Sequence, residues 1–134
     1  NLEVIYSSDD RSFGLHGLVT QPLETMLKQA NTLGTGIGEV IAIGPPLMMR
    51  AVSESTRPYG VKTIASLNSV MIDATGMCGA CMVPIHKEDQ LLRKHACVDG
   101  PEFDAHSIDW EKLLPRFKQF NLQELRSQEL KGLS

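Results

Sequence analysis

The three cysteines of the chain constrain its fold more than any other feature of the sequence. Cys78 and Cys81 form a C-x2-C pair in a glycine-bearing stretch, and Cys97 follows after fifteen further residues. Thiolates are soft donors that suit zinc and iron–sulfur clusters, and this spacing lets two sulfurs reach one metal from a single turn. Gly76 and Gly79 provide the backbone freedom that such a turn needs. The sequence therefore predicts a metal-binding loop around this pair.

Three thiolates leave one position of a four-ligand site unfilled, and the candidates for the fourth ligand separate two interpretations. One histidine could complete a structural zinc site, because zinc accepts three thiolates and one imidazole. The histidines in range are His86, His95 and His106. Asp73, five residues before Cys78, could instead complete an iron–sulfur site, where a harder carboxylate ligand should shift the reduction potential. The spacing alone does not decide between them, although burial without a metal would leave the clustering unexplained.

The first half of the chain alternates between predicted strands and helices. The expected elements are a strand at 2–6, a helix from Thr20, a strand at 39–43, a helix from Pro46 and a strand at 61–67. The run at 39–43 is mostly apolar, which predicts a strand covered on both faces. Such repeats are typical of right-handed crossovers in a parallel sheet. The sequence therefore predicts an α/β fold in which residues 1–68 form part of a parallel nucleotide-binding sheet.

The buried face of the second predicted helix follows from its apolar spacing. This face is expected to carry Leu47, Met48, Ala51 and Val52.

The sequence changes character after the third predicted strand. Residues 69–106 have few apolar side chains, so we expect a small irregular module with short strands that its metal holds together. Pro84 limits the segment 82–85 to an edge strand, since proline cannot donate to a ladder. Residues 107–134 are expected to form a C-terminal helix, capped by Asp109, and a polar tail.

Composition limits the partners and the compartment. The 134 residues carry a formal net charge of −3 and no basic run longer than two residues, which argues against nucleic acid as a partner. No apolar stretch approaches the length of a membrane span, and no secretory signal is recognisable. An odd number of clustered cysteines does not resemble a disulfide framework, so we expect a reducing, cytoplasmic location. No side chain has the setting of a general acid, base or nucleophile, so no catalytic residue is expected.

The order of the four candidate ligands resembles the cluster segment of a flavoprotein family. The motif is Asp73-x4-Cys78-x2-Cys81-x15-Cys97, followed by Val98-Asp99-Gly100-Pro101. The family includes the electron-transfer subunit of dihydroorotate dehydrogenase, the small subunit of NADH-dependent ferredoxin:NADP oxidoreductase and the gamma subunits of sulfhydrogenases. The resemblance implies a ferredoxin–NADP reductase-like fold with an FAD barrel, a nucleotide domain and a C-terminal [2Fe-2S] cluster. One aspartate with three cysteines is most similar to the ferredoxin:NADP oxidoreductase branch, in which Asp73 takes the place of a ligand.

Two positions of the motif depart from the family pattern without removing a ligand. The family usually has glycine after the aspartate, where this chain has Ala74, and often has arginine after the second cysteine, where it has Met82. Ala74 matters only if its position needs a positive φ angle.

The turn Gly44-Pro45-Pro46-Leu47-Met48 resembles the Gly-Pro-Pro-x-Met turn of reductases of this fold. A strand that ends in Gly-Pro before a helix leaves N–H groups free at the sheet edge where nucleotides bind. We therefore expect Gly44, Pro45 and Met48 to contact a nicotinamide nucleotide, although an ordinary helix start has the same signature.

The stretch Ser8-Asp9-Asp10-Arg11-Ser12 resembles the family's loop beside the ribose of the nucleotide, which implies Asp9 and Asp10 as further contacts. A solvated turn has the same composition. Acidic residues there favour NAD, whereas Arg11 could accept the 2′-phosphate of NADP, so the choice of nucleotide stays open.

The resemblance implies an electron-transfer subunit. NAD(P)H would pass a hydride to FAD, and single electrons would leave through the cluster to a catalytic partner subunit. Neither a flavin-binding motif nor a Gly-rich first crossover occurs in the sequence, so we expect the chain to be the C-terminal part of a larger subunit. The alternative from another class is a zinc-stapled interaction module, with no redox role and a leucine-bearing tail as its docking face.

Overall fold

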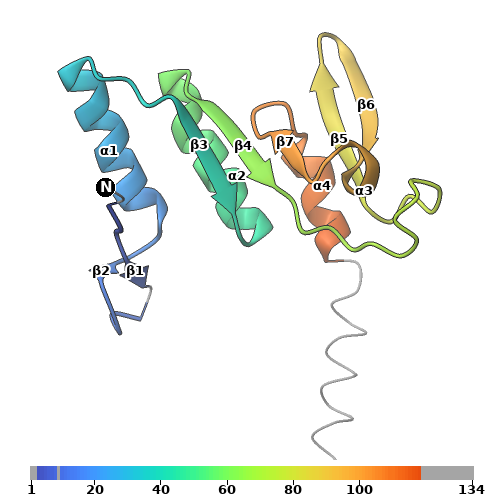
Figure 1. Ribbon diagram of the computed structural model, residues 1–134, viewed down its shortest axis with the longest axis horizontal. Coiled ribbons are helices and arrows are strands. Elements are labelled where there is room, and N and C mark those ends of the chain that lie inside the picture. The colour runs from blue at the N-terminus through green and yellow to red at the C-terminus, as the bar shows by residue number, and fades with distance from the viewer. Residues whose placement is uncertain (1–2, 9, 119–134) are drawn as a thin grey trace, which may run out of the picture. The chain divides into compact units, whose positions relative to one another are not determined.

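The computed structural model describes residues 3–8 and 10–118 of the chain, which divide into two compact units (Figure 1). The first unit contains the described part of Asn1–Ser66 and also Glu102–His106, which return to it from later in the chain. The second unit contains the other described residues.

A three-stranded sheet forms the core of the first unit. β3 (Glu39–Ile43) and β4 (Lys62–Ser66) pair in parallel, as the sequence predicts. β7 (Glu102–Asp104) pairs with the other edge of β4, but in the antiparallel direction. The predicted parallel sheet is therefore corrected to a mixed one. A strand of three residues contains no local pattern that predicts its partner, and this one comes from a distant part of the chain.

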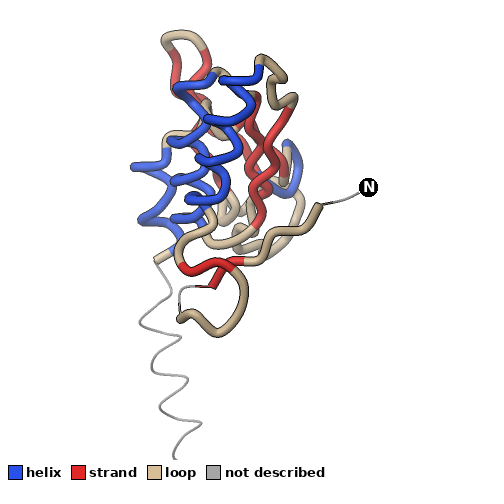
Figure 2. Tube along the Cα trace, turned by 90° about the vertical axis from the view of Figure 1, so that its left-hand side faces the viewer, coloured by secondary structure: helices blue, strands red, loops and turns tan. Residues whose placement is uncertain are grey.

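Two helices accompany this sheet, and α2 covers one of its faces (Figure 2). α1 (Thr20–Leu33) packs against α2 (Pro46–Thr56), and α2 packs against β3 and β4. Both helices are predicted from the sequence, but Thr20 lies inside α1 instead of capping it. Gly34, in the left-handed conformation, ends α1.

The buried face of α2 lies about one residue further along the chain than predicted. The buried side chains are Met49, Val52, Ser53 and Thr56, whereas Leu47 is 61% exposed. The prediction of a buried Val52 is confirmed. Apolar spacing could not indicate Ser53 and Thr56, whose hydroxyl groups are satisfied by internal hydrogen bonds.

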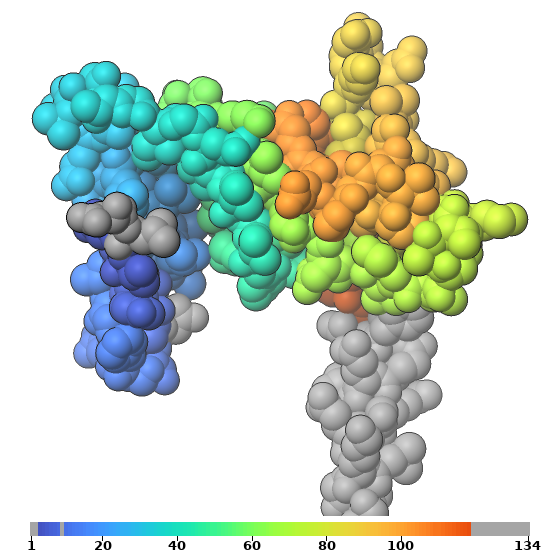
Figure 3. Space-filling view, viewed as in Figure 1, coloured from blue at the N-terminus to red at the C-terminus, as the bar shows by residue number. Residues whose placement is uncertain are grey.

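The opposite face of β3 is open, so the prediction of a strand covered on both faces is wrong. Ala42 is buried, but its neighbours Ile41 and Ile43 are 58% and 72% exposed. Alternate side chains of a strand point to opposite faces, and the described residues supply a helix for only one of them. Figure 3 shows this face of β3 in teal.

The start of the first unit differs from the prediction. The described residues of the predicted strand 2–6 are not in a strand; instead β1 (Ser7–Ser8) pairs in parallel with β2 (Leu15–His16). The rings of Tyr6 and Phe13 meet edge to face, with centroids 5.0 Å apart. A short 3-10 helix, η1 (Arg57–Tyr59), follows α2 and leads towards β4.

The second unit is built on the antiparallel hairpin of β5 (Met82–Lys87) and β6 (Gln90–His95). The predicted strand at 82–85 is confirmed and extends two residues further. α3 (Ala96–Asp99) follows β6 directly, and α4 (Trp110–Phe117) packs against β5.

Asp109 caps α4 as predicted, because its carboxylate accepts a 3.0 Å hydrogen bond from the backbone N–H of Lys112. Trp110 and Leu113 bury the inner face of the helix, and Pro115 lies in its last turn. The tail predicted from Asn121 lies outside the described residues. No helix in the described ranges is long and apolar enough to cross a lipid bilayer.

Candidate metal centre

The carboxylate of Asp73 organises the loop between β4 and β5. Its Oδ1 accepts a 2.9 Å hydrogen bond from the N–H of Thr75, and its Oδ2 accepts a 3.0 Å hydrogen bond from the N–H of Cys78. These hydrogen bonds, that of Thr75 first, lower the pKa of the Asp73 carboxyl. The loop therefore holds an ionised carboxylate against the residue that supplies the first predicted thiolate.

The same loop contains three residues with positive φ angles, which are 58° at Ala74, 83° at Gly76 and 69° at Gly79. A Cβ on Gly76 would lie 3.0 Å from a methyl carbon of Val98, so this glycine is also a point of close packing. The departure at Ala74 therefore matters, because an alanine occupies a left-handed position where the resembling family has glycine.

The β5–β6 hairpin brings Cys81 and Cys97 together. Its register sets Met82 opposite His95, and Ala96 then donates a 3.0 Å backbone hydrogen bond to the carbonyl of Cys81. The two sulfur atoms consequently lie 3.2 Å apart. Two thiolates on one tetrahedral metal ion lie about 3.7 Å apart when each metal–sulfur bond is ~2.3 Å. The observed separation is about 0.5 Å shorter than this, so the two sulfurs would move slightly apart to bind a single metal ion.

The two thiols of this pair influence each other's ionisation. Burial raises the pKa of the Cys81 thiol, but hydrogen bonds from the backbone and thiol of Cys97 outweigh it and leave that pKa below its usual value. Cys97 shifts in the opposite direction. Its side-chain hydrogen bond with Cys81, together with burial, raises the pKa of the Cys97 thiol. The two thiols therefore titrate as a coupled pair.

The four predicted ligands form two pairs in the structure, not one cluster. Cys78 is exposed, and all three cysteines are free thiols. Within the described ranges, no three side chains of His, Cys, Asp or Glu come close enough to form a metal site. Three thiols and a carboxylate nevertheless match the donor chemistry of an iron–sulfur group.

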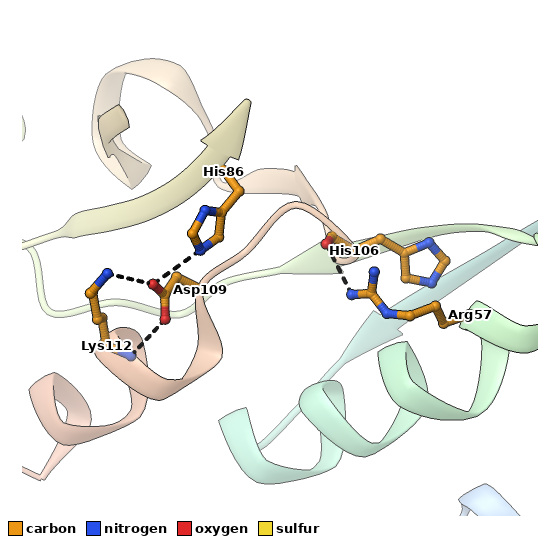
Figure 4. Close-up of polar contacts among 5 residues, drawn as sticks. All are labelled: Arg57, His86, His106, Asp109 and Lys112. Atoms are coloured by element: carbon orange, nitrogen blue, oxygen red, sulfur yellow. Dashed lines mark hydrogen bonds and ion pairs between the residues drawn. The ribbon is translucent and has the colours of Figure 1, made fainter. Parts of the chain in front are cut away.

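Two of the histidines considered for zinc have other partners, and Figure 4 shows the contact of the His86 ring with Asp109. The Nε2 atom of His86 lies 3.1 Å from the carboxylate of Asp109, which also contacts the amine of Lys112 at 2.9 Å. The Nε2 atom of His106 lies 3.0 Å from the hydroxyl of Thr56. These contacts favour structural roles for both rings.

Arg116 contacts the cysteine loop, and the sequence did not single it out. Its Nη2 donates a 2.9 Å hydrogen bond to the carbonyl of Gly79 and a longer one, 3.4 Å, to that of Ala80. A basic residue in the last turn of a short helix is common, and more than thirty residues separate it from the loop. No local pattern could therefore have indicated this contact.

The predicted nucleotide turn forms as a compact unit at the carboxyl end of β3. Gly44 has a φ angle of 153°, and a Cβ at this position would lie 2.5 Å from the terminal methyl of Met48. Pro45 is the N-cap of α2, and no side chain caps this helix end. The structure thus brings Gly44, Pro45 and Met48 together beside an uncapped helix N-terminus.

The other predicted nucleotide contact, Asp10, lies in a turn that it stabilises itself. Its Oδ1 accepts a 3.0 Å hydrogen bond from the N–H of Ser12, and hydrogen bonds from Ser12 lower the pKa of the Asp10 carboxyl. Arg11, in the same turn, has a positive φ angle of 64°. Asp9 lies outside the described residues.

The structure combines a mixed α/β unit with a loop that carries three free cysteines and a carboxylate. Comparison with known proteins shows what this combination is similar to. Residues 68–109 match the iron–sulfur cluster binding domain of dihydroorotate dehydrogenase B.

Similar proteins extend this match over most of the chain. A Thermotoga maritima protein, named as a homologue of the dihydroorotate dehydrogenase B (NAD(+)) electron transfer subunit, is 38% identical over 127 residues. An uncharacterised Clostridium beijerinckii protein from the adh 3′ region is 37% identical over 122 residues. A chain of the NADH-dependent reduced ferredoxin–NADP oxidoreductase structure, which concerns flavin-based electron bifurcation, is 37% identical with a TM-score of 0.77.

The matches cover this chain almost fully but each relative only in part. They span 95%, 91% and 97% of this chain, and 42%, 39% and 43% of the respective relatives. The resemblance that the sequence predicts is confirmed: over most of its length the chain is similar to proteins named as electron transfer subunits of dihydroorotate dehydrogenase B, and residues 68–109 match the iron–sulfur cluster binding domain of that enzyme.

Proposed function

We propose that the chain is the part of an NAD(P)H-dependent oxidoreductase subunit that passes electrons to a catalytic partner subunit through a [2Fe-2S] cluster. The observation that carries this proposal is the 3.2 Å approach of the Cys81 and Cys97 sulfurs inside the matched iron–sulfur domain. It joins two residues that are distant in sequence through the register of a hairpin, which a chance cluster of cysteines would not do.

The ligand set proposed for the cluster is Asp73, Cys78, Cys81 and Cys97. Cys81 and Cys97 would bind one iron, and Asp73 and Cys78, which share the hydrogen-bonded loop, would bind the other. When bound, the cluster supplies one-electron transfer. Asp73 is the ligand that distinguishes this site, since a carboxylate is a harder donor than a thiolate and changes the potential at which an electron enters.

The nucleotide proposed for the first unit is NAD or NADP, bound at the turn of Gly44, Pro45 and Met48. The uncapped N-terminus of α2 offers backbone N–H groups and the positive end of a helix dipole to phosphate. Asp9 and Asp10 are proposed on the ribose side. FAD is proposed as a further cofactor of the intact subunit, because the chain spans only 42% and 43% of two of its relatives.

The test is the metal content of the chain after purification without oxygen. We expect two irons and two inorganic sulfides per chain, with the visible and EPR spectra of a [2Fe-2S] cluster after reduction. One zinc per chain with no visible absorption would overturn the electron-transfer proposal and favour the zinc-stapled interaction module. C81A and C97A should each lose the iron. C78A should retain part of the iron only if the pair of Asp73 and Cys78 is dispensable for binding.

A further inference from the structure

Arg116 holds the turn between the two cysteines of the C-x2-C pair from outside the loop. Gly79 and Ala80 are the two residues that separate Cys78 from Cys81, and both of their carbonyls face the Arg116 guanidinium, at 2.9 and 3.4 Å. Gly79 is left-handed, with a φ angle of 69°, so this turn cannot follow an ordinary backbone path. Both hydrogen bonds come from the Nη2 atom, so this one nitrogen ties together the two peptide groups that lie between the proposed ligands.

Among residues 3–8 and 10–118, no carboxylate forms an ion pair with Arg116. Its Nε is a buried side-chain donor without a hydrogen-bond partner in that part of the chain. Arg116 also lines a cavity of about 20 Å³ together with Ala80 and Met82. The protein thus keeps a permanent, partly buried positive charge against the cysteine loop, where water screens it less than at the surface.

We propose that Arg116 is a positioning residue that orders the cysteine loop and raises the reduction potential of the cluster. This inference rests on the proposed function, since it concerns the group bound by that loop. A cluster with four anionic ligands becomes more negative when it accepts an electron, so a nearby fixed cation stabilises the reduced form more than the oxidised form. Arg116 makes its contacts through backbone carbonyls, which leaves every proposed ligand free.

The experiment compares the full chain as wild type, R116Q, R116K and R93Q, each purified without oxygen. Arg93 is an exposed residue of β6 in the same unit, so R93Q removes the same charge without touching the loop. Two quantities are measured: the midpoint potential of the cluster, and the rate at which bathophenanthroline removes its iron. Neither depends on the activity of the loaded enzyme.

We expect R116Q to make reduction less favourable by roughly threefold to tenfold, the upper value being about 59 mV for a one-electron couple. R93Q should shift the potential less. R116K keeps the charge but replaces the planar guanidinium by an amine on a shorter, flexible side chain, so it should keep a potential near that of wild type and release iron faster. If R116Q contains no cluster while R93Q does, the loss supports the positioning role. The rate of iron release is then compared between R116K and wild type.

Equal shifts in R116Q and R93Q, together with wild-type iron release in R116K, would overturn the inference while leaving the proposed function intact. A wild-type chain without iron and sulfide would instead refute the proposed function, and this inference would fall with it.

Discussion

Asp73 and Cys78 are joined by a 3.0 Å hydrogen bond from the backbone N–H of the cysteine to the carboxylate. The aspartate therefore shapes the loop in addition to its proposed role as a ligand. Its second oxygen accepts the N–H of Thr75, so both oxygens are engaged by backbone donors. A carboxylate oxygen has a further lone pair for a metal, and the two roles are compatible.

Substitutions of Asp73 can separate these two roles. D73N keeps a side-chain oxygen for the loop but loses the negative charge, whereas D73C offers a thiolate and loses both loop hydrogen bonds. If Asp73 is a ligand, D73C should retain the cluster at a changed potential, and D73A should lose iron. The iron-to-protein ratio and a redox titration of each variant measure this. A D73C chain with the wild-type potential, or a D73A chain with full iron content, would contradict the ligand role.

Ala74 should be a point of strain in the loop. Its φ angle of 58° is costly for a residue with a Cβ, by roughly 1–2 kcal/mol, and part of this is offset because alanine restricts the unfolded chain. A74G should therefore raise the free energy of unfolding by about 0.5–1 kcal/mol. Urea unfolding followed by circular dichroism measures the change.

The control for A74G is A80G, in the same loop but without a positive φ angle. It should lower the stability or leave it unchanged, because it adds only unfolded-state entropy. If A74G unfolds more easily than wild type, the left-handed conformation of Ala74 does not carry the strain energy that we assign to it.

The elements of the first unit were largely predictable because their signals are local. The alternation of β3, α2 and β4 follows from apolar runs and from the Gly44-Pro45 boundary. In the second unit, the cap at Asp109 follows in the same way from its position before an amphipathic helix. The buried face of α2 was not predictable from apolar spacing, since Ser53 and Thr56 occupy it. Their burial depends on partners supplied by other elements.

The contacts of the candidate site were predictable only in part. Cysteine spacing indicates a metal, but the approach of Cys81 to Cys97 depends on the hairpin register, which turn and pairing set together. The contact of Arg116 with Gly79 and the pairing of β7 with β4 join residues with no local relationship. Such long-range pairings arise from the packing of the whole structure. No periodic pattern in a single sequence indicates them.

Thr56 is the centre of a buried hydrogen-bond network in the first unit. Its hydroxyl lies 2.7 Å from that of Thr63 and 3.0 Å from the Nε2 of His106, and it can donate to the carbonyl of Val52. T56V would leave the buried Thr63 hydroxyl and the His106 ring without this partner. We expect a loss of about 1.5–3 kcal/mol in the free energy of unfolding.

The matched control is T25V in α1, an exposed threonine that also donates to the carbonyl four residues earlier. It should change the unfolding free energy by less than about 0.5 kcal/mol. Equal effects in T25V and T56V, measured by urea unfolding, would show that the buried network adds nothing beyond a local helix contact.

Asp109 should make the second unit sensitive to acid. The side-chain hydrogen bond of Lys112 is the main cause that lowers the pKa of this carboxyl, and the charge of Lys112 acts in the same direction. The contact with His86 lowers this pKa further (Figure 4). A carboxyl whose pKa is lowered by folding stabilises the folded state fully above its unfolded pKa, about 3.9. That contribution is lost as the pH falls through the lower pKa of the folded state.

The variant D109N keeps an N-cap oxygen for the N–H of Lys112 but removes the charge, and D109A removes both. D109A should cost about 0.5–2 kcal/mol at pH 7, the usual value of an N-cap, and D109N should cost less. The difference in unfolding free energy between wild type and D109N should be constant above about pH 5 and shrink as the pH falls below 4. D89N, at an exposed residue of the β5–β6 turn, is the control and should show no such convergence. Parallel stability curves for wild type and D109N down to pH 3 would contradict the role of the Asp109 charge.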